Sequence, residues 1–396
     1  MDLTTRIRRR QRSGDDSQLV LDYDAISPVA HLREPTGRGS VLERLLDYVD
    51  PVFDDRLPRN AYVWGPPGTG KSAVVTALFA RLGRLRSLSG SVIHTSTRGG
   101  TGVTPDLVSV DARHADSDFG LYRAILDAVL EEFVPEHGVS TETLHARLSE
   151  YLAPYDRRIL VALDHVGEPD ARRLVELASA LDTVPDSLSW VAVGRASPST
   201  LPEAVRPPDR IEVPAYREHA LVDILTARAS AGLARRAVEH EQLRQIASWA
   251  DGNAHDALSA LFAAAHAADS AGASRVRERD LWDGMNAVPR PSVSLGRVLA
   301  LPDSRQQVLR RLVTLGEEGT SVSAAADAIA GSPAVDLSAG TVQRLIYELA
   351  NDGIVERVAS DRSNGAGRPP SRLEPQFPTA VFRQLYDIQP SSIAEA

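Results

Sequence analysis

Residues 65–72, with the sequence Gly-Pro-Pro-Gly-Thr-Gly-Lys-Ser, are the feature that most limits what this chain can fold into. They fit the pattern G-x-x-x-x-G-K-[ST] without a mismatch and directly follow the apolar stretch 61–64. Glycines in this pattern allow backbone N–H groups to surround phosphate oxygens, and the following helix adds the partial positive charge of its N-terminus. The motif therefore predicts a strand, a phosphate-binding loop and a helix, in that order.

Lys71 in this loop is the only lysine among the 44 lysine and arginine residues of the chain. A compact ammonium group suits a position where phosphate oxygens must be reached, and a planar guanidinium does not replace it there. We expect Lys71 to contact the β- and γ-phosphates of ATP, and the Ser72 hydroxyl to coordinate Mg²⁺. The predicted ATP-binding residues of this segment are Gly65, Gly68, Thr69, Gly70, Lys71, Ser72 and Ala73.

The composition is that of a globular protein with two or three domains. The chain has 396 residues, of which 43% are hydrophobic and 24% charged. It contains no cysteine, which excludes disulfides and thiol chemistry, and its ten histidines lack the spacing of a metal site. We expect neither a signal peptide nor a membrane-spanning segment. The formal charge of −9 does not exclude nucleic acid, because local patches decide that kind of binding.

Apolar runs that alternate with helical patterns predict an α/β fold with a parallel sheet. Residues 159–163 and 190–194 are continuous apolar runs, as expected of central strands that are covered on both faces. Helices between such strands place phosphates at the carboxyl ends of the strands. The expected strands are 61–64, 107–110, 159–163 and 190–194, and the expected helices are 41–49, 72–82 (stopped by Gly83) and 121–133.

Changes of composition divide the chain into four parts. Prolines near 207–214 end the strand-and-helix pattern, and an Ala-rich helical stretch with breaks near Gly232 and Asp251-Gly252 follows. A Pro-Arg-Pro sequence at 289–291 resembles a linker. The predicted parts are a basic flexible arm (1–20), a nucleotide-binding core (21–216), a helical lid (217–288) and a C-terminal domain (289–396).

Asp164 ends the apolar strand 159–163 and is the second expected contributor to magnesium binding. A carboxylate at the end of a central strand can hold Mg²⁺ through water beside a phosphate-binding loop. An aspartate at this place can also start a turn or cap a helix.

The C-terminal part predicts three helices followed by a β-hairpin. The expected helices are 304–315, capped by Asp303 and stopped by Gly316, then 321–330 and 338–350. A strand at 354–358, a tip at 361–370 and a returning strand near Arg372 complete a winged-helix pattern. The buried face of the third helix is expected to consist of Val342, Leu345, Ile346 and Leu349.

The third helix of such a module can enter the major groove of DNA, and a basic wing can contact phosphates or a minor groove. Winged helices also bind proteins, so this alternative stays open. The candidate DNA-binding residues are Thr341, Arg344, Arg362, Arg368 and Arg372.

Taken together, residues 65–72, the strand into Asp164, the segments 213–216 and 252–258 and the winged helix resemble the AAA+ superfamily. Within it, the chain is similar to archaeal replication initiators of the origin-recognition type, over residues 20–385. The resemblance implies that Tyr216 and Arg228 lie against the nucleotide. The alternatives are a core-packed tyrosine and a solvated helix arginine.

Three positions depart from the family pattern. His165 stands where the family usually has a glutamate that orients water, Arg195 where it has an asparagine, and His255 where the lid carries an arginine. Losing a positioned base typically costs about 10²–10⁴ in rate. We therefore expect ATP binding with very slow or absent hydrolysis, with Asp164 and His165 as the catalytic candidates. Glu168 is close in sequence, and both histidines could equally be inert surface residues.

The resulting expectation is an ATP- and Mg²⁺-binding initiator in the cytoplasm that recognises duplex DNA, for which a replication origin is the expected site. The resemblance adds a replicative helicase as a partner, a second DNA contact within 111–120 and a monomer in solution or an oligomer on DNA. Arg113 favours that second contact, whereas Asp111 and Asp116 weaken it.

Arg206 or Arg210 could act on a neighbour's nucleotide, although an ordinary surface arginine is the alternative. Rival functions are an ATP-liganded DNA-binding regulator and an active DNA-remodelling or transport ATPase.

Overall fold

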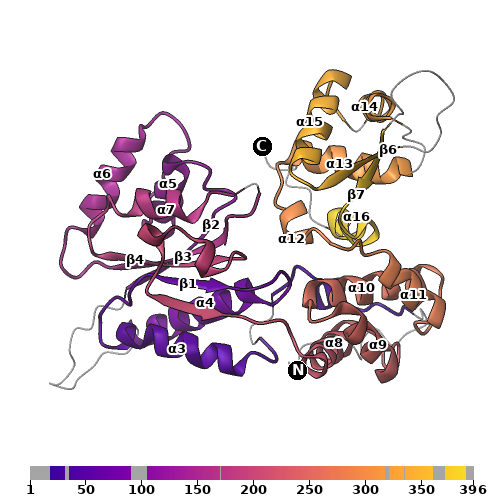
Figure 1. Cartoon of the computed structure of the whole chain (residues 1–396), viewed down its shortest axis with the longest axis horizontal. Coiled ribbons are helices and arrows are strands. Elements are labelled where there is room, and N and C mark those ends of the chain that lie inside the picture. Colours follow the sequence, from indigo (N-terminus) through magenta and orange to yellow (C-terminus); the bar gives the residue numbers. More distant parts are fainter. Residues whose placement is uncertain are drawn as a thin grey trace. The chain divides into compact units, whose positions relative to one another are not determined.

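The chain forms two compact units in the computed structural model. The structure describes residues 18–31, 35–90, 105–169, 171–316, 321–333, 335–359 and 371–388 (Figure 1). One unit is His31–Tyr216, and the other combines the described residues up to Ala30 with those of Arg217–Ala396. No helix of the described residues is both long enough and apolar enough to cross a membrane.

A five-stranded parallel sheet forms the centre of the first unit, which confirms the predicted α/β fold. The strand order is β2-β3-β4-β1-β5, and each neighbouring pair is parallel. Parallel pairing brings all carboxyl ends to one edge, where the phosphate-binding loop follows β1. The strands are β1 (Ala61–Trp64), β2 (Asp106–Asp111), β3 (Ile159–Val166), β4 (Leu188–Gly194) and β5 (Asp209–Glu212).

Helices cover both faces of this sheet. Along β3, Leu160 and Ala162 join one buried cluster, whereas Val161 and Leu163 join the other, because successive strand residues point to opposite faces. This alternation explains why residues 159–163 of the strand are all apolar. Figure 1 shows α5 (Asp118–Val129), α6 (Thr141–Leu152) and α7 (Leu174–Leu181) on one face, and α3 (Gly39–Phe53) and α4 (Lys71–Gly90) on the other.

Some elements of this unit differ from expectation. The helix after the loop runs through Gly83 instead of ending there. A Cβ atom at Gly83 would meet nothing within 4 Å, so the glycine neither caps nor makes a close approach. The helix α5 ends at Val129, short of the expected 133. The pattern also missed α6, α7 and the short edge strand β5.

The second unit begins with residues that were expected to belong elsewhere. Leu19 and Val20 are buried, and the Leu19 N–H donates to Asp269 Oδ1 at 2.7 Å, so the predicted flexible arm ends before residue 19. The short helix α2 (Tyr23–Ile26) packs on α8, not on the core to which its residues were assigned. Gly232 permits this contact, because a Cβ there would lie 2.6 Å from the Asp22 carbonyl oxygen.

A group of helices that pack on one another follows Arg217 in the second unit. The breaks expected near Gly232 and Asp251 are confirmed: α8 ends at Gly232, and Asp251 has a φ of 48° after α9. The helices are α8 (Glu218–Gly232), α9 (His240–Ala250), α10 (Ala254–Ser270) and α11 (Glu278–Asn286).

The C-terminal residues form the expected three helices and an antiparallel strand pair, in agreement with a winged helix. Pro302, not Asp303, is the N-cap residue of the first of these helices, and Gly316 ends it. A final helix, α16, was not predicted from the sequence; its Val381 and Phe382 are fully buried. The elements are α12 (Leu295–Val298), α13 (Asp303–Leu315), α14 (Val322–Ala330), α15 (Ala339–Asn351), β6 (Val355–Ala359), β7 (Ser371–Pro375) and α16 (Thr379–Ile388).

Candidate nucleotide site

The loop between β1 and α4 has a backbone that only glycines adopt without strain. Gly65, Gly68 and Gly70 have φ values of 151°, 68° and 76°. A Cβ atom at Gly65 would lie 2.1 Å from the Val213 carbonyl oxygen, and one at Gly70 would lie 2.6 Å from the Tyr216 hydroxyl. The glycines are therefore needed for close packing as well as for the turn.

The Lys71 ammonium lies inside this loop. Its Nζ donates to the carbonyl oxygens of Gly65 at 2.9 Å and Pro66 at 2.6 Å. Burial lowers the pKa of Lys71 to about 8, the Arg195 charge adds to this effect, and the Asp164 carboxylate opposes it. An ammonium that is partly stripped of water is a strong partner for phosphate oxygens.

Ser72 and Asp164 meet where α4 begins and β3 ends. The Ser72 hydroxyl lies 2.9 Å from Asp164 Oδ1. A hydroxyl and a carboxylate are hard oxygen donors of the kind that Mg²⁺ prefers, and both are partly exposed. The described residues therefore fit a magnesium ion that is shared with a bound nucleotide.

His165 occupies an irregular position directly after Asp164. The pairing of β3 with β4 shifts between Leu163 and Val166, and His165 has a φ of 60°. Its Nδ1 lies 3.5 Å from Glu168 Oε1 and its Nε2 lies 3.7 Å from Asp164 Oδ2. Burial lowers the pKa of His165, but the hydrogen bond to Glu168 and the Asp164 charge outweigh it, so the pKa is raised.

Glu168 and Arg195 form an ion pair beside the loop. Arg195 Nη2 lies 2.7 Å from Glu168 Oε1, and the Glu168 side chain is 6% exposed. Burial raises the pKa of Glu168. The hydrogen bond with His165 and the charge of Arg195 lower it by more, so the net shift of this pKa is downward. Sequence reasoning noted both residues and did not pair them.

The Arg113 side chain is folded back onto Asp111 and does not extend into solvent. Its guanidinium holds the Asp111 carboxylate through Nε at 2.9 Å and Nη2 at 2.5 Å, and its side chain is 9% exposed. Asp111 lies opposite Asp164 in the sheet, so this pair lies beside the carboxylate that was predicted to contribute to magnesium binding. The expectation that Arg113 favours a DNA contact is not supported by this placement.

Arg38 is a residue that sequence reasoning missed. Its guanidinium carbon lies 3.4 Å from the centroid of the Tyr216 ring, and Arg38 is 4% exposed. Its Nε and Nη2 atoms are buried and have no hydrogen-bond partner among the described residues. Tyr216 is thus packed between the loop and a buried guanidinium. The only sequence signal was an arginine just before a helix, which is too common to be informative.

One candidate arginine and one candidate histidine of the second unit both have internal partners. Arg228 is buried, and its guanidinium donates to the carbonyl oxygens of Ala25 and Ala30. The His255 Nε2 accepts the Leu295 N–H at 3.0 Å, which connects α10 to α12. Neither is a solvated surface residue, and a nucleotide contact of Arg228 stays a prediction.

The candidate DNA-binding residues that the structure describes make local contacts. The Thr341 hydroxyl lies 2.9 Å from that of Ser338 at the start of α15, and Arg344 Nη1 donates to Glu348 Oε1 at 2.6 Å. Arg372 pairs with Glu374. Arg362 and Arg368 lie outside the described residues.

The two arginines considered for action on a neighbouring nucleotide differ. The Arg206 Nη2 donates to the Leu201 carbonyl oxygen at 2.9 Å, whereas Arg210 is exposed on β5. Arg210 is therefore the more exposed of the two, and an action of either arginine on a neighbouring nucleotide stays a prediction.

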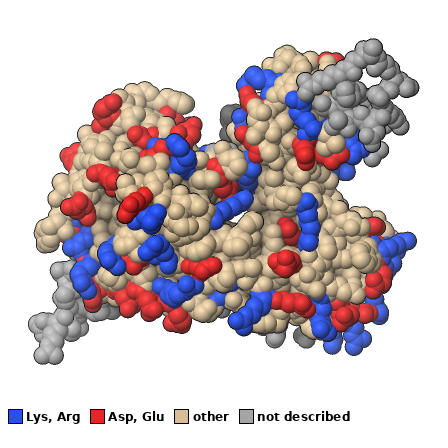
Figure 2. All heavy atoms as spheres, in the orientation of Figure 1, with Lys and Arg blue, Asp and Glu red and all other residues tan. Residues whose placement is uncertain are grey.

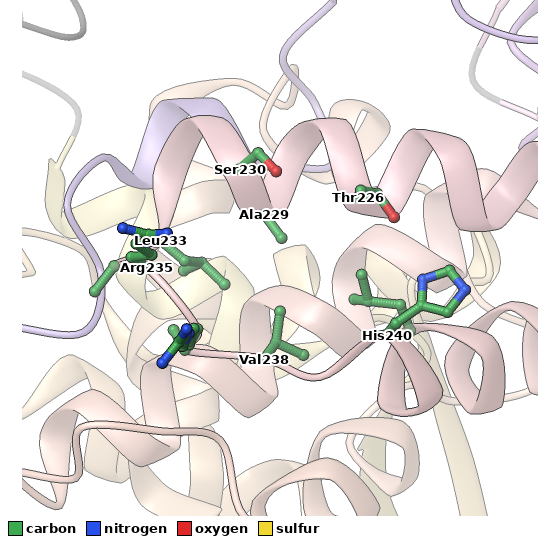
Figure 3. Close-up of a pocket in the computed structure, with 11 residues that line it drawn as sticks. Thr226, Ala229, Ser230, Leu233, Arg235, Val238 and His240 are labelled. Atoms are coloured by element: carbon green, nitrogen blue, oxygen red, sulfur yellow. The ribbon is translucent and has the colours of Figure 1, made fainter.

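A cavity of about 380 Å³ lies in the helical part of the second unit and is separate from the loop. Figure 3 shows it between the end of α8, with Thr226 and Ser230, and the start of α9, with His240. It contains none of the loop residues.

Comparisons with known proteins agree with this geometry. The AAA ATPase domain family matches residues 34–192. The phosphate-binding loop, the parallel sheet and this match define the class: the chain carries an AAA ATPase domain. It is similar over most of its length to archaeal ORC1-type DNA replication proteins, which confirms the predicted resemblance. The relative from Pyrococcus furiosus is 23% identical over 71% of this chain and 68% of its own length.

A second relative, ORC1-type DNA replication protein 6 of Halobacterium salinarum, is 25% identical and covers 88% of this chain and 90% of itself. Among solved structures, the Aeropyrum pernix ORC1 protein in complex with DNA has a TM-score of 0.61 at 22% identity, with 94% of this chain and 98% of that chain covered. Cdc6p from Pyrobaculum aerophilum has a TM-score of 0.56 at 20% identity and covers 93% and 99%. These structures share the fold.

Proposed function

We propose that this protein is an ATP-binding, origin-recognition-type DNA replication initiator that binds duplex DNA and hydrolyses ATP very slowly or not at all. The observation that carries the proposal is the extent of the similarity. It runs through both the nucleotide-binding unit and the C-terminal module, over 88% of this chain and 90% of the Halobacterium relative. Similarity that was confined to the ATPase domain would support a proposal of ATP binding alone.

The loop residues are the proposed ATP ligands. Lys71 would exchange its carbonyl partners for phosphate oxygens, while Ser72 and Asp164 would hold Mg²⁺. The ion, when bound, neutralises phosphate charge. The Tyr216 hydroxyl lies against Gly70, and the Arg38 guanidinium lies over the Tyr216 ring. Tyr216 and Arg38 therefore belong to the wall of the proposed site.

Slow hydrolysis is supported by the residues that follow Asp164. A general base must reach the proton that it abstracts, and its geometry matters before its pKa. His165 sits at an irregular strand position between Asp164 and Glu168, and the Glu168 carboxylate is bound by Arg195. The side chains that are closest to replacing the usual glutamate are therefore already engaged with each other.

DNA binding is proposed for the exposed stripe of α15. Gly340, Arg344, Tyr347 and Asn351 are exposed at helical spacing, and Arg357 of β6 lies over the Tyr347 ring. On the face drawn in Figure 2, acidic and basic side chains are interspersed, so local groups must provide the contacts. We expect Arg344→Ala to weaken duplex binding several-fold and to reduce its salt dependence by about one phosphate contact.

A regulator that binds ATP and DNA without initiating replication is the second candidate. It is favoured by the internal partners of His165, Arg195 and His255, at positions where the family pattern has other residues. A replicative helicase partner and assembly on DNA belong to the first candidate.

A genome-wide binding map of the tagged protein separates the two candidates. Peaks at replication origins, reduced by Arg344→Ala, are expected for the initiator. Peaks confined to promoters, with origins empty, would contradict it and support the regulator.

A further inference from the structure

The cavity between α8 and α9 combines an apolar floor with an open mouth. Its lining residues come from the end of α8, the connecting turn and the start of α9, so one stretch of chain builds the whole cavity (Figure 3). Ala229, Leu233 and Leu243 are buried and form the floor, whereas Thr226 and His240 are exposed. A volume of about 380 Å³ is enough to take up the apolar groups of a ligand.

Two neighbouring arginines give this cavity a basic rim. Arg235 and Arg236 both line the cavity and are exposed. Among the described residues, neither guanidinium has an ion-pair or hydrogen-bond partner, and none of the lining residues is acidic. Unpaired basic groups stand out in a chain whose formal charge is −9. Their charge is therefore available to a ligand, and the complementary ligand is an anion.

The turn that carries the arginines is held by backbone hydrogen bonds. The Ala237 N–H donates to the Ala234 carbonyl oxygen at 3.1 Å, and the Ala237 carbonyl oxygen accepts the Val276 N–H at 2.7 Å. Arg236 has a φ of 63°, a left-handed conformation that a non-glycine residue adopts only at a cost. Arg275, which is exposed and precedes Val276, adds a third basic residue to this edge. Because the turn is already ordered, binding does not have to order it, and this favours affinity.

The apolar floor decides which kind of acidic macromolecule fits. Phosphates of a nucleic acid bind arginine through charge and need no apolar cavity. A protein segment with acidic residues uses both features of the site, because its carboxylates pair with guanidinium groups and its aliphatic or aromatic side chains fill the floor. The cavity is therefore better matched to a protein segment than to nucleic acid.

We propose that the cavity between α8 and α9 is a docking site for an acidic segment of a partner protein. The segment places a large apolar side chain against Ala229 and Leu243, and its carboxylates pair with Arg235 and Arg236. This inference does not depend on ATP binding, because no residue of the phosphate-binding loop lines the cavity.

A display selection of random short peptides on the full-length protein tests the chemistry of the ligand. We expect the selected peptides to combine several acidic residues with a leucine, isoleucine or phenylalanine. A selected peptide is then labelled, and its dissociation constant is measured by fluorescence polarisation. Replacing its acids by amides, or its apolar residue by serine, should each weaken binding about tenfold. Selection of peptides without acidic residues would overturn the proposal.

Variants of the protein test where the peptide binds. Arg235→Gln combined with Arg236→Gln removes the basic rim and should weaken peptide binding about tenfold. Ala229→Leu fills the floor without changing any charge and should weaken binding about fivefold. Arg244→Gln is the matched control, because Arg244 lies on α9, is 55% exposed and pairs with Glu241; it should leave binding unchanged. Thermal unfolding checks that each variant is folded.

Three outcomes with these variants would contradict the proposal. Equal peptide affinity in wild type, the arginine variant and Ala229→Leu would place the binding elsewhere on the protein. A loss caused by the arginine variant but not by Ala229→Leu would mean charge attraction that makes no use of the cavity. Unchanged peptide affinity, together with a several-fold weaker affinity for a DNA duplex in the arginine variant, would assign the rim to nucleic acid.

Discussion

The two sides of the nucleotide site are built differently. On the loop side, Lys71 and the glycines follow a sequence pattern that fixes both backbone shape and charge. On the strand side, His165, Glu168 and Arg195 come from two strand ends and bind one another. Because the two sides belong to different elements, we expect that the ability to hold ATP can be kept while the ability to cleave it is lost.

The largest expected effect concerns the loop side. Lys71→Ala should weaken ATP binding by about 10² or more, because no other lysine exists to replace its ammonium. Calorimetric titration with Mg-ATP measures this loss, and thermal unfolding checks that the variant is folded. Unchanged affinity in a folded variant would mean that ATP binds elsewhere.

The rigidity of the loop is tested by a pair of glycine substitutions. Gly65→Ala should destabilise the protein by about 2 kcal/mol or more, since its φ is 151° and the added methyl would clash with the Val213 carbonyl oxygen. Gly83→Ala, in the middle of α4 with open space around it, should instead stabilise by about 0.5–1 kcal/mol. Urea denaturation compares the two, and equal effects would argue against the loop geometry.

The junction of the two sides is tested through magnesium. Ser72→Ala should lower ATP affinity about tenfold in the presence of Mg²⁺ and have little effect in EDTA, because the hydroxyl acts through the ion. The measurement is nucleotide binding with and without the chelator. A loss of the same size in EDTA would indicate a direct contact with phosphate or a folding defect.

The smallest effect is expected on the strand side. His165→Ala should change the rate of phosphate release less than threefold, because an imidazole bound between two carboxylates is poorly placed to activate water. Single-turnover assays with labelled ATP provide the rate. A tenfold or larger decrease would show that His165 does replace the missing glutamate.

The loop side could be predicted from the sequence because its signal is local. Residues 65–72 specify their own backbone, and the apolar runs at 159–163 and 190–194 specify buried strands. The strand β5 was missed because it is a four-residue edge strand with the charged sequence Asp-Arg-Ile-Glu. Helix α4 is longer than predicted. A glycine such as Gly83 is typical of a helix end, but nothing in the fold requires a glycine at this position.

The strand side could not be predicted, because its contacts join residues that are far apart in sequence. Arg195 and Glu168 meet only after β3 and β4 pair. Arg38 lies near the first residue of the unit and contacts Tyr216, which is its last residue. Tertiary pairing also decided between alternatives for the histidines. His165 and His255 both have partners within the chain, so neither is a free surface side chain, and a catalytic role of His165 stays a prediction.

We propose that this site holds ATP and turns it over very slowly. The most direct measurement is ATP affinity and phosphate release on the same sample, with and without duplex DNA. Tight ATP binding with no measurable release over many minutes, whether or not DNA is present, is the predicted result. Brisk release that is stimulated by DNA would contradict it.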